Sequence, residues 1–584
     1  MDTKSPIDHP TKQRFVGTPI ERLKHYRQRL ETLRTKRSTH LSRWREIADH
    51  TYPWMTQYLS DDYRESERSI KKMMKSHPAR SVKVLAAGMH SGITPPSRKW
   101  FRLTFHDAKY TQDKPAKDWL YDVEQRMQTL LQRANAYDAL QELYMNLVLY
   151  GTAALFIDND ADDAIRFYTV PNGAYMIANS ARGNVNTFYR EFQLSVAELV
   201  ERFGEERVSQ RVREAHGRGE YDMLIDIVQV IEPNPLPRPN ALYASDTAPF
   251  RGVFFERNAG ASTESEVFLD ESGYFEMPVM VTRWEVLGGN EYGVGPGHYA
   301  LSDVKALKFN ALSQAKLIDY LVSPPLTAPI DARHLEGGPK MAPGTISYYN
   351  PQQGPPTITA LYQPDPNALV MLINQEENIK RDIDRAFYVD IFLSLLDESI
   401  KSGITATQIL KMYQEKLLML GPVLERLNND LLDPMIKRVF GIMMREGLLP
   451  DPPEGIDDGD IKIEYVSTAA QGQKSSTITG IETVSAFLGN AAATFPEVLD
   501  AFDMDKALRA YAELHDLPPT VIRDEKVVEK IRQDRQQAAA EEQQAMQAQQ
   551  LVESAKTLSE TGTQDKNALT DIMSATGMTP GMGY

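Results

Sequence analysis

Two long helical segments constrain the fold of this chain more than any other feature. Apolar residues recur at helical spacing over 298–322 and again over 367–388, and the intervening segment 323–366 is rich in Pro and Gly. At 1.5 Å per residue, the two helices would be about 37 Å and about 33 Å long. In one chain they predict a helical hairpin. Repeated around a symmetry axis, such hairpins would form a funnel wall with apolar seams and a charged lumen.

Each of the two helices combines an apolar stripe with a separate set of charges. The apolar residues that we expect at the seams between copies are Leu301, Val304, Ile379 and Ile383. The charged residues that we expect to line the lumen are Lys305, Lys308, Glu376, Glu377, Asp382 and Asp384. The alternative is that these charges simply pair between adjacent helices.

The rest of the chain predicts an α+β fold that is predominantly helical. The segments with a helical pattern are 19–50, 70–91, 115–150, 195–203, 405–447 and 475–584. The segments with a strand pattern are 101–105, 153–158, 165–170, 187–192, 223–231, 279–286 and 345–349. Gly421-Pro422 and Asp433-Pro434 should kink or divide the helical region that contains them.

Composition excludes several classes of protein. The chain has 584 residues and no cysteine, which excludes a disulfide framework, Cys-ligated metal sites and a thiol nucleophile. The longest apolar run, 147–157, is too short to span a bilayer, so no membrane partner is expected.

Charge is distributed unevenly along the chain. Residues 1–102 contain 22 Lys/Arg and 10 Asp/Glu, a net charge of +12, although the whole chain has a net charge of −15. We therefore expect this basic region to face DNA or the acidic surface of another protein. The alternative is that it forms an ordinary solvated helix face.

Motifs that would indicate an enzyme are missing. The segment 472–477 lacks the glycine spacing of a phosphate-binding loop, and no His-Glu-x-x-His pair occurs. The acidic run 158–163 lacks the glycine and glutamate of a calcium loop, so a hairpin turn is the better interpretation. The glycines of 292-YGVGPGHYAL-301 could cradle a phosphate, but a turn that leads into the following helix is favoured. We expect no catalytic residues, no metal and no cofactor.

Four stretches, in this order and spacing, carry a resemblance to a known family. They are 85-LAAGMHSGITPPSRKWFRLT-104, 183-GNVNTFYREFQLSVAELVERFG-204, 292-YGVGPGHYALSDVKALKFN-310 and 404-ITATQILKMYQEKLLMLGPVLERLNNDLLDPMIKRVFGIMMREGLLP-450. From about residue 70 to residue 475, the chain resembles the portal proteins, or head-to-tail connectors, of short-tailed bacteriophages. It departs from the family pattern at Gln408, where Glu is usual, and at Asn428-Asn429-Asp430.

The resemblance implies a portal fold assembled as a closed ring of twelve copies at one capsid vertex. Such a ring is the channel for genome packaging into the procapsid and for DNA ejection. The implied partners are other copies of the chain, viral double-stranded DNA, the terminase motor, major capsid and scaffold proteins, and tail adaptor or tail proteins. The protein would be a virion component, assembled in the host cytoplasm.

The family's parts can be placed along the sequence. They are the wing 1–296, first stem helix 297–322, clip 323–366, second stem helix 367–388, tunnel loop 389–403, long kinked wing helix with its return strand 404–474, and helical crown with C-terminal tail 475–584. In the tunnel loop, the polar residues expected to project into the lumen are Asp397, Glu398 and Lys401.

Two other classes of function compete with this interpretation. A collar or adaptor of the head–tail junction is a ring component too, but the long hairpin and the kinked helix do not suit one. A phage hydrolase or nuclease would need a convergent acidic or histidine constellation, which the sequence does not show.

The tunnel loop generates a test. Deletion of 398–402 removes polar residues and touches none of the expected seams, so rings should still assemble. Particles built with the deleted chain should fail to package or retain full-length DNA, as measured by genome length and yield. Normal yields of full particles would contradict a gating role for this loop.

Overall fold

The structure is a computed structural model in which most of the chain is described. The described residues are 18–59, 75–106, 110, 113–160, 162–234, 247–258, 268–329, 342–349, 358–362, 364–390, 420–453, 461–465, 468–492, 502–514, 517, 521, 523 and 525–560. The chain divides into two compact units, Met1–Thr111 with Trp119–Gly480, and Gln112–Asp118 with Ile481–Tyr584.

The elements confirm a mixed α+β fold. The helices of the N-terminal half are α1 (Pro19–Thr51), the short η1 (Pro53–Tyr58), α3 (His77–Ile93), α5 (Lys114–Arg133), α6 (Ala136–Tyr150), α7 (Val196–Phe203) and α8 (Gln210–Gly217). The later helices are α10 (Pro296–Val322), α11 (Pro366–Ala386), α15 (Gly421–Leu427), the π-helix η4 (Asn428–Leu432), α16 (Asp433–Arg445), α17 (Thr468–Ala492), α18 (Met504–Leu514) and α19 (Glu525–Glu560). Neither η1 nor α8 was predicted.

In the part of the chain that the structure describes, four sheets accompany these helices. The largest has the strand order β4 (Tyr175–Asn179), β5 (Val185–Ser195), β6 (Leu224–Pro233), β7 (Phe250–Glu256) and β8 (Asp270–Tyr274), all antiparallel. A second antiparallel sheet orders β3 (Ala164–Val170), β2 (Thr152–Asp160) and β9 (Val279–Arg283). A third pairs β1 (Phe101–Phe105) with β13 (Ile461–Tyr465), and a fourth orders β11 (Ile346–Tyr349), β10 (Leu326–Pro329) and β12 (Thr359–Ala360). Of these strands, β4, β7, β8, β10 and β12 were not predicted.

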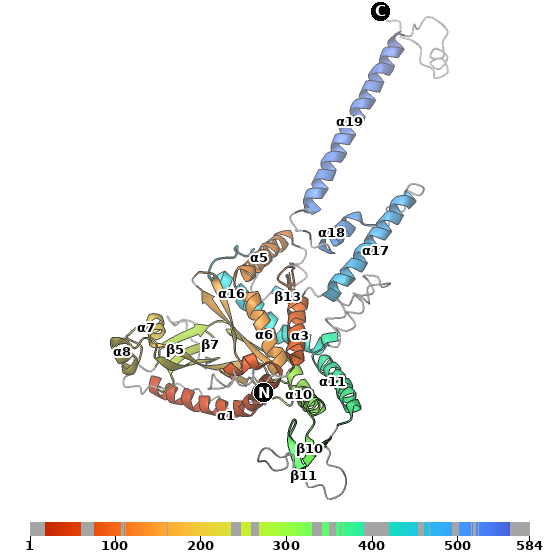
Figure 1. Ribbon diagram of the computed structural model, residues 1–584. Helices are drawn as coiled ribbons and strands as arrows, with labels where there is room; N and C mark the ends of the chain where they lie inside the picture. The colour runs from red at the N-terminus through yellow and green to blue at the C-terminus, as the bar shows by residue number, and fades with distance from the viewer. Residues whose placement is uncertain are drawn as a thin grey trace, which may run out of the picture. The chain divides into compact units, whose positions relative to one another are not determined.

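The five-stranded sheet is covered on both faces. Successive side chains of a strand point to opposite faces, so β6 serves two cores at once. Val228 and Val230 pack with α1, whose Leu23, Tyr26, Leu30 and Leu33 form its buried stripe. On the other face, residues such as Ile227 pack with α7 and α8. Figure 1 shows α1 running along this sheet, with α7 and α8 at its far end.

The positive charges of α1 are used mainly inside the chain. Its arginines form ion pairs with carboxylates of the large sheet: Arg22 with Glu271 at 2.8 Å, Arg34 with Glu191 at 2.7 Å and Arg29 with Glu232 at 3.9 Å. Arg37 is buried and donates to the carbonyls of Gly173 and Tyr175. The expectation that the basic region faces an external anion is therefore corrected for α1, whose arginines dock it on the sheet. The remaining basic residues of 1–17 and 60–74 lie outside the described residues.

The glycines ahead of α10 are required by close backbone contact. A Cβ on Gly297 would lie 2.2 Å from the carbonyl oxygen of Leu149, and a Cβ on Gly293 would lie 2.3 Å from that of Gly151. Gly151 itself, at φ +68°, would place a Cβ 2.5 Å from the carbonyl carbon of Val294. The amide of Gly293 donates to the Thr152 hydroxyl at 2.7 Å, so it is not free to bind a phosphate. The turn interpretation is confirmed, and these glycines join α10 to the end of α6.

The acidic run 158–163 is the hairpin turn that the sequence predicted. The carboxylate of Asp160 accepts the backbone amides of Asp162 and Asp163 at 2.9 and 3.0 Å, closing the connection from β2 to β3. Among the residues that the structure describes, no group of three or more His, Asp or Glu side chains is arranged to hold a metal ion.

The helical region changes form just before Pro434, as the sequence predicts, whereas the residues just before 420, which would show a division at Gly421-Pro422, lie outside the described residues. Pro434 has no amide hydrogen to donate to the preceding turn, and the helix widens to the π form over Asn428–Leu432. The wider turn brings Asp430 to within 3.2 Å of the buried Arg283 on β9. Farther along, Arg438 of α16 donates to the carbonyl oxygen of Ile157 at 3.0 Å. The helix is thereby held against the three-stranded sheet.

The second unit is helical. Its elements hold together by polar contacts: Tyr511 donates to Glu482 at 2.8 Å, and Arg532 pairs with Asp505 at 2.6 Å. Phe487, which is 66% exposed, and Leu508, which is 60% exposed, leave apolar surface open on α17 and α18. Of the helices in the described ranges, none is both long and apolar enough to cross a membrane.

The glycine contacts predict a large loss of stability on a small substitution. Gly151→Ala should lower the free energy of unfolding by about 2–4 kcal/mol, because the added methyl group overlaps backbone atoms and the backbone has a positive φ. Gly183→Ala is the matched control, since Gly183 has φ +83° and no atom within 4 Å of the added Cβ. Thermal unfolding measures both. Equal shifts in Tm would show that only the backbone angle matters.

Candidate functional site: the helical hairpin and its polar anchor

The hairpin of α10 and α11 is the strongest candidate for a functional element. α10 begins at Pro296 directly after the glycine contacts, and its first half is buried by Leu301, Val304 and Leu307. α11 begins at Pro366, where the Asp365 carboxylate caps the amide of Asn367 at 2.9 Å. Figure 1 shows the two helices side by side, with α11 against α3 and the β10–β11 sheet beyond the hairpin. The helices lie within two residues of their predicted bounds.

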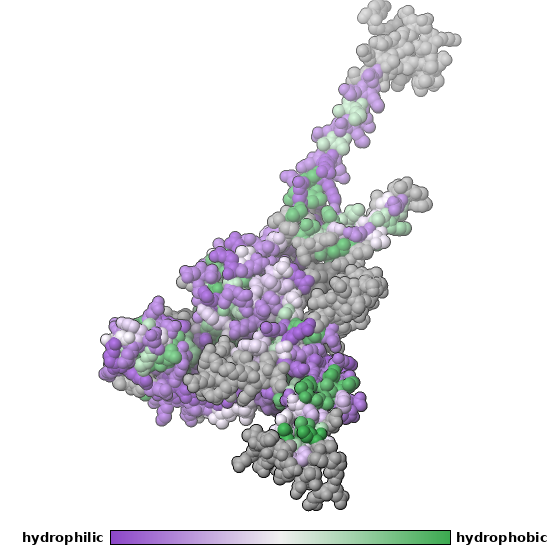
Figure 2. Space-filling model, in the orientation of Figure 1, coloured by the Kyte–Doolittle hydropathy of each residue, from purple (hydrophilic) through white to green (hydrophobic). Residues whose placement is uncertain are grey.

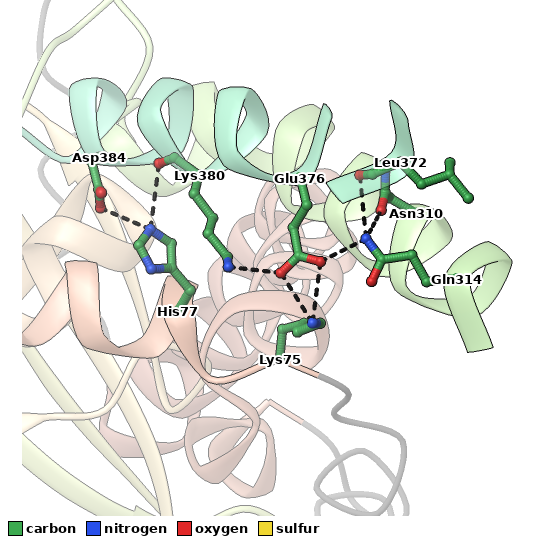
Figure 3. Close-up of polar contacts among 8 residues, drawn as sticks. All are labelled: Lys75, His77, Asn310, Gln314, Leu372, Glu376, Lys380 and Asp384. Carbon is green, nitrogen blue, oxygen red and sulfur yellow. Dashed lines mark hydrogen bonds and ion pairs between the residues drawn. The ribbon is translucent and has the colours of Figure 1, made fainter. Parts of the chain in front are cut away.

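A polar cluster holds the two helices together (Figure 3). Asn310 and Gln314 of α10 both donate to the carbonyl oxygen of Leu372 on α11, each at 3.2 Å. Gln314 also donates to Glu376 at 2.8 Å. A hydrogen bond from a side-chain amide to a main-chain carbonyl fixes the position of one helix relative to the other along the helix axis. Apolar contacts alone do not fix it.

The carboxylate of Glu376 is the centre of this cluster. Glu376 is 6% exposed, and its carboxylate accepts hydrogen bonds from Lys380 at 2.7 Å, from Lys75 at 3.0 Å and from Gln314. Burial would raise its pKa, but hydrogen bonds from Lys380, Lys75 and Gln314 outweigh burial and lower the pKa to about 2. The ionised carboxylate therefore stabilises the fold above pH 4.5, and this contribution is lost as the pH falls toward 2.

A second pair lies two turns farther along α11. Asp384 contacts His77 of α3 at 3.0 Å and accepts the Ser81 hydroxyl at 2.7 Å. Burial acts to raise the pKa of Asp384, but the hydrogen bonds from His77 and Ser81 outweigh it and hold the pKa below its usual value. The same His77 ring also contacts the carbonyl oxygen of Lys380 at 3.3 Å. Glu376 and Asp384 thus anchor α11 to α3 and the residues before it.

Some of the charged residues that were expected to line a lumen have partners inside the chain. Glu376 and Asp384 are engaged inside the chain, with partners that include α3 and Lys75, a pairing that the sequence analysis did not foresee. Lys305 is bound to Glu46 of α1. Lys308 is half-buried.

Glu377 and Asp382 are the two expected carboxylates that are exposed. Each is close to an arginine of its own helix, Glu377 to Arg381 at 3.8 Å and Asp382 to Arg385 at 3.3 Å. The exposed face of α11 is therefore closer to neutral than the four carboxylates suggested. A channel-lining role for these residues stays a prediction.

The residues expected at seams between copies lie mostly in the chain's own core. Leu301 and Val304 are each 3% exposed, and Ile383 is fully buried, while Ile379 is half-buried. Their apolar stripe packs the hairpin onto the body, so a contact between copies would have to use other residues. The tunnel-loop residues Asp397, Glu398 and Lys401 lie outside the described residues.

Other apolar residues of the hairpin are open. They are Phe309 (73% exposed), Leu312 (41%) and Val322 (76%) on α10, and Val370 (56%), Met371 (72%) and Ile373 (45%) on α11. Figure 2 shows hydrophobic residues gathered on the hairpin and on the small sheet beyond it. Phe309 and Leu312 lie on the side of α10 away from Asn310 and Gln314, which contact α11. Helical periodicity in the sequence could not distinguish these exposed residues from the buried stripe, because the second half of α10 carries apolar residues on several sides.

Comparisons with known proteins identify the family of this chain. The family model for the bacteriophage head to tail connecting protein matches residues 23–522. The chain belongs to this family. It is 35% identical to the portal protein of Salmonella phage epsilon15 over 551 residues, which cover 94% of this chain and 98% of that protein. It is 34% identical to the probable portal protein of Bordetella phage BPP-1 over 549 residues, which cover 93% and 96% of the two chains.

The anchor of this connector-family chain can be tested at one atom. Glu376→Gln removes the charge that three donors surround and leaves the shape, so Tm should fall by an amount equivalent to about 1–3 kcal/mol. Amide hydrogen exchange should rise in α11. Glu377→Gln is the control, because Glu377 is exposed and should change stability by less than about 0.5 kcal/mol. Equal changes in Tm for the two substitutions would contradict an anchoring role for Glu376.

Proposed function

We propose that this chain is the subunit of a portal: a ring at one vertex of a phage capsid that conducts DNA during packaging and ejection and connects the head to the tail. The observation that carries the proposal is the near full-length match to two phage portal proteins, combined with a hairpin whose two helices both expose apolar residues. The role is structural. The terminase motor, which supplies the energy, is a partner and not part of this chain.

The parts of the portal follow the segments named in the sequence analysis. The wing is 1–296 with 404–474, the stem is the hairpin 297–322 and 367–388, the clip is 323–366, the tunnel loop is 389–403 and the crown is 475–584. Twelve copies form the closed ring. In this arrangement the clip is the docking platform for terminase and then for the tail proteins, and the wing faces capsid and scaffold proteins. The ring is a component of the virion, assembled in the host cytoplasm.

The exposed apolar residues of the hairpin support a head-to-tail contact between copies. In a cyclic ring, one surface of each copy meets a different surface of the next. The α10 side with Phe309 and Leu312 would pack on the α11 side with Val370 and Met371 of the neighbouring copy. Helices pack with axes about 8–10 Å apart, so side chains of this size fill the space between them. Burial of each such side chain contributes about 1.5–3 kcal/mol.

These surfaces give a test of the ring. Phe309→Asp and Met371→Asp should each prevent closed rings under native mass spectrometry, because a carboxylate would be buried in the apolar contact. The circular dichroism and Tm of the single chain should stay unchanged, since both residues are exposed there.

Two further variants locate the effect. Tyr221→Asp changes another exposed aromatic residue, outside the hairpin, and should leave the rings intact. Val304→Asp should lower the stability of the chain itself, because Val304 belongs to its core. Intact rings from both Phe309→Asp and Met371→Asp would exclude this contact, and a wild-type chain that forms no ring would exclude the portal proposal itself.

A further inference from the structure

Three histidines lie where α1 packs against α10, at the base of the hairpin. His40 and His50 belong to α1, and His298 belongs to the first turn of α10. All three are half-buried. Histidine is the side chain whose ordinary pKa places its change of charge between pH 5 and pH 8. A group of histidines in one helix–helix contact therefore makes the charge of that contact depend on pH.

The hydrogen bond of His298 requires a neutral ring. Its Nδ1 atom accepts the backbone amide of Gly295 at 3.3 Å, so this nitrogen carries no proton. The bond satisfies an amide at the start of α10, where the helix itself supplies no acceptor. A proton on Nδ1 would turn the acceptor into a donor. It would also place a positive charge at the positive end of the helix dipole.

The groups that act on His298 from α1 are positively charged or can become so. They are Arg43, which is exposed, and His40. Burial, then Arg43 and then His40 lower the pKa of His298 to about 4. The ring centre of His40 lies 4.9 Å from that of Tyr292, and burial lowers the pKa of His40 although Glu291 acts to raise it. Both histidines are therefore neutral at pH 7.

His50 meets the part of α10 that carries two lysines. Burial is the largest cause that lowers the pKa of His50, and Lys308 and Lys305 lower it further. The carboxylates of Asp49 and Glu46 act in the opposite direction, but Glu46 is bound to Lys305. The Nδ1 atom of His50 is buried and has no hydrogen-bond partner among the described residues. A proton on this atom would have no acceptor.

The carboxylates of this contact keep their charge in the range where histidine titrates. A hydrogen bond from Lys305 lowers the pKa of Glu46, and one from Lys36 lowers the pKa of Glu291, so both are ionised at pH 5. The histidines behave differently, because their pKa values in the folded chain lie below the ordinary value of 6.5. The unfolded or opened chain then binds more protons, and the stability of the contact falls as the pH drops below about 6.5.

We infer that His40, His50 and His298 form an acid-sensitive latch, which holds α10 on α1 at neutral pH and loosens the base of the hairpin when the three rings become protonated. Arg43 and the lysines of α10 already supply positive charge to the contact, so each added proton meets repulsion. The latch uses only the packing of α1 on α10, and it does not depend on the portal proposal.

Amide hydrogen exchange of the full-length chain at pH 7.5 and at pH 5.0, corrected for the intrinsic exchange rates, measures the opening of the latch. The equilibrium constant for opening of the first turns of α10 should rise by about 30-fold from His298 alone, because its pKa changes from about 4 to 6.5 on opening. Amides of β5, β6 and β7 should stay protected at both pH values. Equal loss of protection in these strands would indicate global acid unfolding and overturn the inference.

Three variants locate the effect. His298→Gln can still accept the amide of Gly295 but takes up no proton, so most of the rise at pH 5.0 should disappear. Arg43→Gln changes an exposed residue and removes one source of repulsion, so it should reduce the rise by about twofold to fivefold. His106→Gln is the matched control, because His106 is exposed and lies outside α1 and α10.

The same rise in His298→Gln as in the wild type would contradict the latch. So would an equal reduction in His106→Gln, which would show that any histidine of the chain has this effect. Arg43→Gln gives an answer even where His298→Gln fails to fold at pH 7.5, because an exposed arginine is not needed for the core. An unchanged rise in Arg43→Gln would show that repulsion from α1 does not operate on His298, and the inference would fail.

Discussion

Close backbone contact between the end of α6 and the residues before α10 is the constraint on which the hairpin depends. Gly151 ends α6 with a positive φ, and Gly293, Gly295 and Gly297 approach it and Leu149 to distances that leave no room for a Cβ. The close approach lets α10 start within the body, where Leu301 and Val304 complete the core. The direction in which the hairpin leaves the body is therefore set by main-chain contacts.

The hairpin is held to the rest of the chain by two kinds of interaction, apolar packing and polar contacts. Apolar side chains near the start of α10 bury it in the body. On α11, Glu376 binds Lys75, and Asp384 contacts His77 and Ser81 of α3. A polar attachment is directional, because each hydrogen bond fixes the position of its partners. It also spares apolar residues such as Met371, which stay available for another copy. The chain can thus be folded alone and still have surface for assembly.

The basic residues near the start of the chain pair largely with carboxylates of the same chain, which the distribution of charge along the sequence did not suggest. The net charge of +12 in residues 1–102 indicated an external anion. In the structure, Arg22 and Arg34 of α1 meet carboxylates of the large sheet, far away along the chain. Net charge counts residues along the sequence, but Coulomb interactions depend on distance in space, so a basic helix and an acidic sheet compensate each other.

The sequence by itself determined the mixed α+β class, the hairpin to within two residues at each end, the change of helix form just before Pro434 and the turn at Asp160. Each of these depends on local physics: helical periodicity, the missing amide hydrogen of proline, and capping by a nearby carboxylate. The sequence also carried the family resemblance that the comparisons with known proteins confirmed. Only the tertiary structure decided which apolar stripe of α10 is core and which is open, and that Glu376 is an anchor. Both depend on what packs against the helix, and the partner residues, such as Lys75, lie hundreds of positions away. The strands β7 and β8 were missed for the same reason, since pairing with neighbouring strands determines them more than their own pattern does.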